Sequence, residues 1–466
     1  MPAAHGAFLD HAPADWQILQ QDANGFASLR LAGHWLAKPD QQRQQVMVRL
    51  VRTLDAVPVA AHLDWQPAAM EAGERWTAEL TRIPAGGPYR LETQLRTDQS
   101  TTPEWALRGD ARDLLGVGDL WIIAGQSNSA GYGKGPVDDP PEIGLHLFDN
   151  AQRWRLATHP LNDSTGTVHP VNTENANPGH APWLQFARIL RRTLNHPIGL
   201  IQTALGGSPL SRWNPREGAP GSAELFDNLV QVVQAAGGKV RGVLWYQGCS
   251  DTSAPAATTY LDRFAQAVAA WREALAAPDL PVITVQLNRV TSAHNEASHL
   301  AWSQVREAQR QAARAIPGVL VVPASDLPLS DFIHTSPVGN LILGHRAAAA
   351  ALDQVYGIRC DWRAPDIAQA GFAADRKQVI VTVDQVTGEL RSADGAAQPV
   401  RIDDADGTVP IEKVHYAGGK MIVELGRPAN GSAWLTMGYG THPPLLPIDM
   451  TRNIPMLSCW KVPIAE

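Results

Sequence analysis

Residues 119–128 read Asp-Leu-Trp-Ile-Ile-Ala-Gly-Gln-Ser-Asn, an apolar run that ends in a glycine and three polar side chains. A short apolar run closed by a turn signal is typical of a strand that is buried on both faces of a sheet. Similar runs recur further along the chain. The five runs are 120–124, 198–202, 240–246, 282–287 and 319–322.

Longer stretches with helical periodicity alternate with these runs. The clearest of them are 183–194, 260–275, 300–314 and 341–355. Buried strands that alternate with helices predict βαβ units, a parallel sheet and helices on both faces. We therefore expect an α/β domain with a flavodoxin-like three-layer α/β/α arrangement and about five parallel strands.

The two flanks have a different pattern, in which apolar and polar residues alternate and glycine or proline turns intervene. Examples are 46–51 and 89–95 before the α/β part, and 378–383 and 420–425 after it. This period of two is typical of antiparallel strands. The expected organisation is an N-terminal β-sandwich-like domain over 1–115, an α/β domain over 116–360 and a C-terminal β domain over 361–466.

Composition and charge exclude several classes of function. The formal net charge is −7 without a long block of like charge, so nucleic acid is not an expected partner. The three cysteines form no Cys-x-x-Cys pair, and no cluster of residues has the spacing of metal ligands. His180 lies in a loop rich in proline and asparagine and is expected at the surface or at the rim of a pocket.

No apolar run approaches the roughly 18 residues that cross a bilayer, so the chain is expected to be soluble and without a membrane partner. The first 17 residues lack a basic region followed by an apolar region, as a signal peptide would have. The expected location is therefore cytoplasmic, or periplasmic or secreted if a leader has been removed.

Polar and glycine-rich residues follow four of the five apolar runs. They are Ser127 after the first, Gly206 and Gly207 beyond the second, Gln247 directly after the third, and Asp331 and His334 after the fifth. In open α/β sheets, ligands bind outside the carboxyl ends of the strands. We therefore expect these residues to converge at one edge of the sheet.

The converging residues suit nucleophilic catalysis by a serine. A serine hydroxyl needs a base to accept its proton, and a carboxylate commonly orients that base. Asp331 and His334 are three residues apart and can share one turn. Backbone N–H groups of Ser127 and of Gly206 or Gly207, with the side-chain amide of Gln247, could stabilise the oxyanion of a tetrahedral intermediate.

In this order the clusters resemble the SGNH hydrolase superfamily, and specifically the sialate O-acetylesterase-like carbohydrate esterases. The resemblance rests on residues 119–128, 205–213, 242–248 and 331–334, and extends to 86–89 and 452–455. It implies an SGNH catalytic domain in which Ser127 is the nucleophile, His334 the general base and Asp331 its orienting acid. It also implies a carbohydrate O-acetylesterase with an acetylated saccharide as substrate, and no metal or organic cofactor.

The chain departs from these relatives at Cys249, where they commonly carry a glutamate. We expect Cys249 to line the substrate pocket without acting as a nucleophile. Gln126, Asn128 and Trp213 are the other expected substrate contacts, and for Trp213 the reason is that the apolar faces of sugar rings stack on indoles. Trp183 is expected near the sugar for the same reason as Trp213.

Two other functions remain compatible with the sequence. The same triad could hydrolyse short-chain acyl esters that are not carbohydrates, or the chain could bind carbohydrate without catalysis. The saccharide also stays open, since sialic acid and acetylated xylan or xyloglucan fragments all fit. The sequence does not indicate an oligomeric state.

Overall fold

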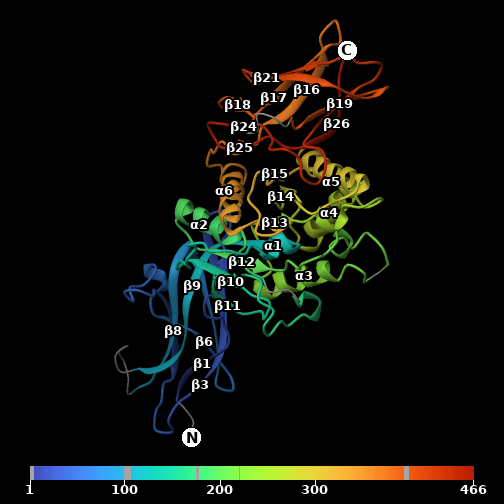
Figure 1. Cartoon of the computed structure of the whole chain (residues 1–466). Helices are drawn as coiled ribbons and strands as arrows, with labels where there is room; N and C mark the ends of the chain where they lie inside the picture. Colours follow the sequence, from blue (N-terminus) through green and yellow to red (C-terminus); the bar gives the residue numbers. More distant parts are fainter. Residues whose placement is uncertain (1–4, 99–105, 175–177, 220, 393–397) are drawn as a thin grey trace.

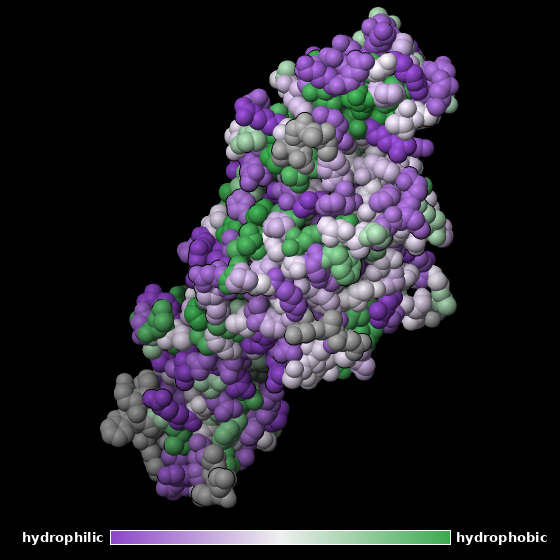
Figure 2. Space-filling model, in the orientation of Figure 1, coloured by the Kyte–Doolittle hydropathy of each residue, from purple (hydrophilic) through white to green (hydrophobic). Residues whose placement is uncertain are grey.

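The computed structural model describes residues 5–98, 106–174, 178–219, 221–392 and 398–466. The molecule is elongated, with all-β parts at the two ends and a mixed α/β part between them (Figure 1). Hydrophilic and apolar residues are interspersed over the face drawn in Figure 2. Within the described residues, no helix is long and apolar enough to cross a membrane.

The middle part is built on seven strands of a large mixed sheet. Its strand order is β11-β10-β12-β9-β13-β14-β15, and within the described residues the six strands from β10 to β15 in this order run parallel. The bounds are β9 Leu107–Gly125, β10 Leu145–Phe148, β11 Trp154–Leu156, β12 Ile198–Gln202, β13 Gly242–Tyr246, β14 Val282–Gln286 and β15 Val319–Pro323.

All five apolar runs of the sequence overlap strands of this sheet. The sixth parallel strand, β10, has only four residues and follows a loop rich in proline and glycine, so its pattern was too short to predict a strand. The coarse expectation of an α/β part between two β parts is confirmed.

Helices pack on both faces of the parallel strands. Helices α2 and α6 contact each other and one face, whereas α4 and α5 contact each other on the other side, with α3 beside α4. The helices are α1 Ser127–Ala130, α2 Trp183–Leu194, α3 Glu224–Ala236, α4 Tyr260–Ala274, α5 Glu296–Ala315 and α6 Pro337–Gln354. Short 3₁₀ turns are η1 Ala61–Leu63, η2 Pro170–Asn172, η3 Leu210–Arg212 and η4 Cys249–Asp251.

Strand β9 joins the N-terminal part to the middle part. Its first half pairs antiparallel with β8, and its second half lies between β12 and β13. The expected domain boundary at 115/116 therefore falls inside a continuous strand. The N-terminal strands are β1 Gly6–His11, β2 Ile18–Gln20, β3 Phe26–Leu36, β4 Gln45–Arg52, β5 Gln66–Pro67, β6 Ala69–Glu71, β7 Arg75–Pro84 and β8 Gly86–Arg96.

The C-terminal part consists of small antiparallel sheets around their own apolar core. Its strands are β16 Asp366–Phe372, β17 Gln378–Asp384, β18 Leu390–Arg391, β19 Val400–Asp404, β20 Gly407–Val409, β21 Ile411–Ala417, β22 Lys420–Leu425, β23 Trp434–Met437, β24 Ile448–Asp449, β25 Ile454–Pro455 and β26 Cys459–Pro463.

A fully buried arginine on α5 attaches this C-terminal part to the carboxyl-terminal edge of the parallel strands. Arg306 donates hydrogen bonds to the carbonyl oxygens of Leu287, Asn288, Gly440 and Thr441. Burial lowers the pKa of Arg306 to about 10, so the guanidinium remains charged at neutral pH. The Arg306 side chain therefore holds the segment after β14 against the turn after β23.

A buried carboxylate holds the opposite, amino-terminal edge of the sheet. Asp119 on β9 accepts hydrogen bonds from Gln20, Gln21, His196 and Arg241, over distances of 2.7–3.0 Å. Burial raises the pKa of the Asp119 carboxyl, but the hydrogen bond from His196 and the charge of Arg241 outweigh it and lower the pKa to about 2. Asp119 thus joins β9 to the residues that precede β12 and β13.

Replacing this carboxylate should destabilise the fold in a pH-dependent way. We expect Asp119→Asn to lower the free energy of unfolding by about 2 kcal/mol at pH 7, because each unit of pKa depression is worth about 1.4 kcal/mol. A lowered carboxyl pKa stabilises the fold above the unfolded value and loses that effect as the pH falls through the folded value. The loss should therefore shrink between about pH 5 and pH 2 in urea unfolding followed by tryptophan fluorescence.

The exposed pair of Arg52 and Asp55 offers a control, since surface ion pairs contribute little. Asp55→Asn should leave the free energy of unfolding nearly unchanged at both pH values. A loss in Asp119→Asn that is as large at pH 2 as at pH 7 would contradict the role given to the ionised carboxylate.

Candidate active site

The predicted nucleophile lies at the carboxyl end of β9, in the middle of the parallel strands. Gly125 has a φ of +116°, and a Cβ there would lie 2.4 Å from the carbonyl oxygen of Tyr246 on β13. Only glycine fits this close approach. The chain then turns, and Ser127 becomes the first residue of α1, where its N–H has no acceptor inside the helix.

The structure brings the three predicted triad residues together. The Nε2 atom of His334 is 3.0 Å from the hydroxyl oxygen of Ser127, and its Nδ1 atom is 2.7 Å from a carboxylate oxygen of Asp331. The other carboxylate oxygen accepts the backbone N–H groups of Ile333 and His334 at 2.8 and 2.7 Å. The turn from Asp331 to His334 is thus closed by the same side chain that holds the imidazole.

Asp331 remains ionised well into the acid range. Burial raises the pKa of its carboxyl, but the hydrogen bonds from Ile333 N–H, His334 N–H and the imidazole outweigh burial and lower the pKa below its ordinary value. A carboxylate accepts the imidazole N–H, so the other ring nitrogen is left to face the serine.

Two amides beside the nucleophile fasten the loops of the site to one another. Asn128 accepts the N–H of Thr335 at 2.9 Å and donates to the carbonyl of Ile333. Gln126 accepts the N–H of Gly248 at 3.0 Å. Both side chains are nearly fully buried, so these residues, predicted as substrate contacts, are placed to position the loops.

The glycine loop after β12 lies beside two residues that the sequence did not indicate. The N–H of Gly206 donates to Oε2 of Glu174 at 2.8 Å, and a Cβ at Gly206 would lie 2.6 Å from the hydroxyl of Tyr132. The Tyr132 ring is 5.0 Å from the ring of His334. Gly207 is exposed, and the space around its Cβ position is open. Of the two predicted glycine donors, the N–H of Gly206 is thus taken by Glu174.

The structure does not bring Gln247 to the predicted oxyanion position. Its amide nitrogen donates to the carbonyl of Ser208 and to the carboxylate of Asp251, and its amide oxygen accepts from Tyr260. Gln247 is fully buried, and both of its amide hydrogens have acceptors. Asp251 also pairs with Arg263 at 2.9 Å, which leaves Asp331 as the carboxylate on His334.

The predicted contact between Trp213 and a sugar is contradicted by burial. Trp213 and Trp183 are both 0% exposed. Their indole N–H groups donate to Ser208 and Ser129, so these tryptophans support the loop after β12 and the turn after Ser127. An exposed aromatic side chain does occur at the site: Phe332, beside Asp331, is 55% exposed. A lone phenylalanine gave no signal in the sequence.

Cys249 lies between two residues whose N–H groups bind Gln126, and we expect its thiol to be unreactive. It lies at the start of η4, partly exposed, two residues after Gln247. Burial raises the pKa of the Cys249 thiol to about 12. Because the thiolate is the nucleophilic form, the thiol is inert at neutral pH.

One group of three side chains among the described residues has a spacing that a metal ion could use: Asp139, His159 and His180. Both imidazoles approach one carboxylate oxygen through Nε2, and Arg188 binds the other oxygen. The N–H of Ala181 points at Nδ1 of His159, which places the ring proton on Nε2, toward the carboxylate. A protonated Nε2 is not a metal ligand, so this cluster fits hydrogen bonding better than metal binding.

This cluster also corrects the placement expected for His180, which is 5% exposed rather than at a pocket rim. The backbone of His180 pairs with Gly133, next to Tyr132. The cluster therefore supports the segment that carries Tyr132 to the site.

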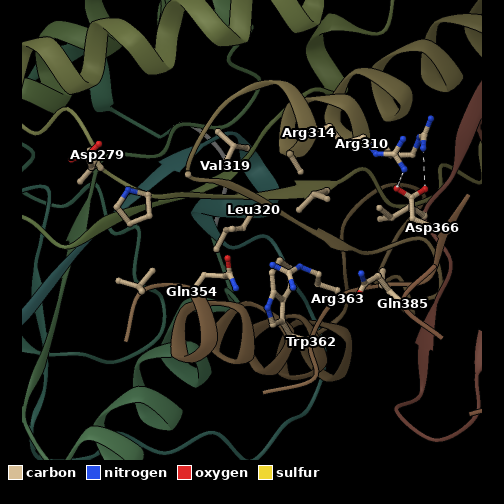
Figure 3. A pocket seen from close by; sticks show the side chains of 18 of the residues that line it. Asp279, Arg310, Arg314, Val319, Leu320, Gln354, Trp362, Arg363, Asp366 and Gln385 are labelled. Atoms are coloured by element: carbon tan, nitrogen blue, oxygen red, sulfur yellow. Dashed lines mark hydrogen bonds and ion pairs between the residues drawn. The ribbon is translucent and has the colours of Figure 1, made fainter. Parts of the chain in front are cut away.

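Figure 3 shows residues that line a large cavity, whose volume is about 1080 Å³. Its lining includes Arg241, Asp279 and Val319, at the amino ends of β13, β14 and β15, together with Trp362 and Arg363 from the start of the C-terminal part. Ser127 lies at the carboxyl end of the sheet. The cavity and the triad therefore belong to opposite edges.

Comparison with known proteins assigns the chain to a family. The sequence profile of a carbohydrate esterase family, the sialic acid-specific acetylesterases, matches residues 117–353, just over half of the chain. The chain belongs to this carbohydrate esterase family. The predicted resemblance is confirmed, and family membership makes the protein a carboxylic ester hydrolase that acts on carbohydrate acetyl groups.

Individual relatives agree with the family assignment. A probable carbohydrate esterase of Arabidopsis thaliana is 27% identical over 257 residues, which are 50% of this chain and 90% of that protein. The sialate O-acetylesterase of Rattus norvegicus is 29% identical over 157 residues, 30% of this chain and only 27% of the rat protein. A carbohydrate acetylesterase from Xanthomonas citri shares the fold with a TM-score of 0.66 and 23% identity, over 97% of this chain and 96% of that one.

The high pKa of Cys249 leads to a prediction about thiol reagents. At pH 8 only about one thiol in ten thousand is ionised when the pKa is about 12, so iodoacetamide should leave esterase activity intact over an hour. Cys249→Ser should keep at least half of the parent kcat/KM on a small acetyl ester. Rapid inactivation at pH 8 that Cys249→Ser abolishes would contradict the unreactive thiol.

Proposed function

We propose that the protein deacetylates its saccharide through an acetyl-enzyme on Ser127, with His334 as general base and Asp331 as the residue that orients it. The observation that carries this proposal is the unbroken contact from Asp331 through His334 to the Ser127 hydroxyl, at 2.7 and 3.0 Å. Both distances are within hydrogen-bonding range for a nucleophile and its base.

In the first half-reaction Ser127 Oγ attacks the carbonyl carbon of the acetyl ester while His334 Nε2 accepts the hydroxyl proton. The imidazolium then protonates the sugar oxygen as the ester bond breaks. Water attacks the acetyl-enzyme in the second half-reaction, with His334 again accepting and returning a proton, so that acetate leaves. Asp331 stays ionised throughout and stabilises the imidazolium.

Negative charge that develops on the carbonyl oxygen needs donors already in place. The N–H of Ser127 is available as the first N–H of α1, and Gly207 is an exposed residue of the glycine loop with open space around its Cβ position. We assign the N–H groups of these two residues to the oxyanion hole. Gly206 would join them only when its N–H is released by Glu174.

The wider architecture fits the same proposal. We infer a flavodoxin-like three-layer SGNH catalytic domain over 116–360, with β domains over 1–115 and 361–466. Support comes from the helices on both sides of the parallel strands and from the apolar cores that each of the three parts has of its own. The placement of the triad at the carboxyl ends of β9 and β15 agrees with ligand binding in open α/β sheets.

Mutation of the triad tests the mechanism. Ser127→Ala and His334→Ala should each lower kcat for 4-nitrophenyl acetate by about three orders of magnitude or more, since triad members act as a unit. Asp331→Asn should lower kcat somewhat less. The melting temperature of each variant, measured by circular dichroism, serves as the control for folding.

An acyl-chain series distinguishes the carbohydrate acetylesterase from an esterase for longer chains. The parent should prefer acetyl over butyryl and hexanoyl esters in kcat/KM. Turnover of folded Ser127→Ala within tenfold of the parent would reject the acetyl-enzyme mechanism.

A further inference from the structure

Glu174 places a carboxylate beside the triad that the mechanism above does not use. Its Oε2 accepts the N–H of Gly206 at 2.8 Å and the amide of Asn162 at 3.4 Å. The hydroxyl of Tyr132 also donates to this carboxylate, and burial together with that charge raises the pKa of Tyr132 above its ordinary value. All three donors are neutral.

Among the described residues, the groups that donate hydrogen bonds to Glu174 thus carry no formal charge. Within the described ranges no lysine, arginine or histidine forms an ion pair with it, and its three donors are those just named. The two other acids of the site differ: Asp331 pairs with His334 and Asp251 with Arg263. Glu174 is half-buried, so its charge is less screened than that of a surface carboxylate.

The chain holds this carboxylate in place. The backbone N–H of Glu174 donates to the hydroxyl of Ser164 at 2.7 Å. Asn162 is fixed by an amide of Asn150 at 2.6 Å, and Asn150 in turn accepts from Asn172 at 2.7 Å. A side chain supported in this way is suited to recognise a ligand, because little ordering is needed on binding.

Its position is close to the reaction. Gly206 adjoins Gly207, whose N–H we assign to the oxyanion hole, and Tyr132 connects Glu174 to the ring of His334. We therefore expect a saccharide whose acetyl carbonyl meets Ser127 to come near the carboxylate. An ionised oxygen pair has about four acceptor sites, of which three are used here.

We propose that Glu174 is a specificity-determining residue: it accepts hydrogen bonds from the hydroxyl groups of a neutral acetylated saccharide and repels a saccharide that carries its own carboxylate. The inference rests on the proposed function, since it places the ester carbonyl at Ser127. Like charges that share a partly buried site disfavour each other, whereas a hydroxyl donor binds a carboxylate well.

The test uses pairs of substrates that differ chiefly in charge. One pair is 9-O-acetyl-N-acetylneuraminic acid and its methyl ester; the other is methyl 3-O-acetylglucuronide and methyl 3-O-acetylglucoside. Each pair also differs slightly at the carboxyl group, by a methyl group in the first and by a hydroxymethyl group in the second, so an effect seen in both pairs is assigned to charge. Acetate release should show that the parent favours the neutral member by about tenfold in kcat/KM, a difference expected for one partly screened charge pair. Raising NaCl from 10 to 500 mM should reduce that preference.

Glu174→Gln keeps the shape of the side chain and removes its charge. We expect it to reduce the preference for the neutral member to about twofold or less, chiefly by raising kcat/KM for the acid. Glu389→Gln, a like change at an exposed carboxylate of the C-terminal part, should keep the parental ratio. Comparing two substrates within each variant separates charge selection from any general loss of activity.

A preference that is the same in the parent and in folded Glu174→Gln overturns the proposal, and so does a parent that favours the acids. The mechanism is judged separately, with 4-nitrophenyl acetate and Ser127→Ala, because that ester has no saccharide and no charge. Normal turnover by Ser127→Ala would reject the acetyl-enzyme mechanism. The charge preference would still be tested independently, by comparing the parent with Glu174→Gln.

Discussion

The parallel pairing of β9 between β12 and β13 is the constraint on which the site depends. Parallel strands end at the same edge, so the turn after β9 meets the glycine loop after β12 and the Gln247 loop after β13. Gly125 permits the close approach of the β13 backbone that this pairing requires. At the other edge, Asp119 joins β9 to the residues that lead into the same two neighbours. The backbone thus fixes the position of the proposed nucleophile, Ser127, independently of the side chains of His334 and Asp331.

Hydrogen bonds between loops then set the triad geometry. His334 comes from a segment far along the chain, and Asn128 holds that segment next to Ser127. Asp331 closes the turn around His334 with the same carboxylate that accepts the imidazole. Buried polar groups that are fully paired specify one arrangement, because any alternative leaves a donor or acceptor unsatisfied. This explains why many of the polar residues around Ser127 support the site instead of facing the substrate.

The sequence predicts what depends on periodicity and chain order, and it misses what depends on packing. The apolar runs and the polar residues that follow them were enough to predict the parallel sheet and to bring Ser127, Asp331 and His334 together. The pattern did not reveal β10, which is too short, or Glu174, which lies in a loop without periodicity. Gln247 and Trp213 have the right chemistry for the roles predicted, but their side chains point into the interior, and side-chain direction at a strand end is decided by neighbours distant in the sequence.

The central claim is that Ser127 carries the acyl group, and a covalent probe tests it most directly. An alkyl fluorophosphonate reacts with an activated serine and leaves a stable adduct that peptide mass spectrometry can locate. The account predicts one adduct per chain, on Ser127, with labelling lost in His334→Ala because the hydroxyl is then not activated. Labelling at Cys249 or at another serine, with Ser127 unmodified in an active enzyme, would contradict it.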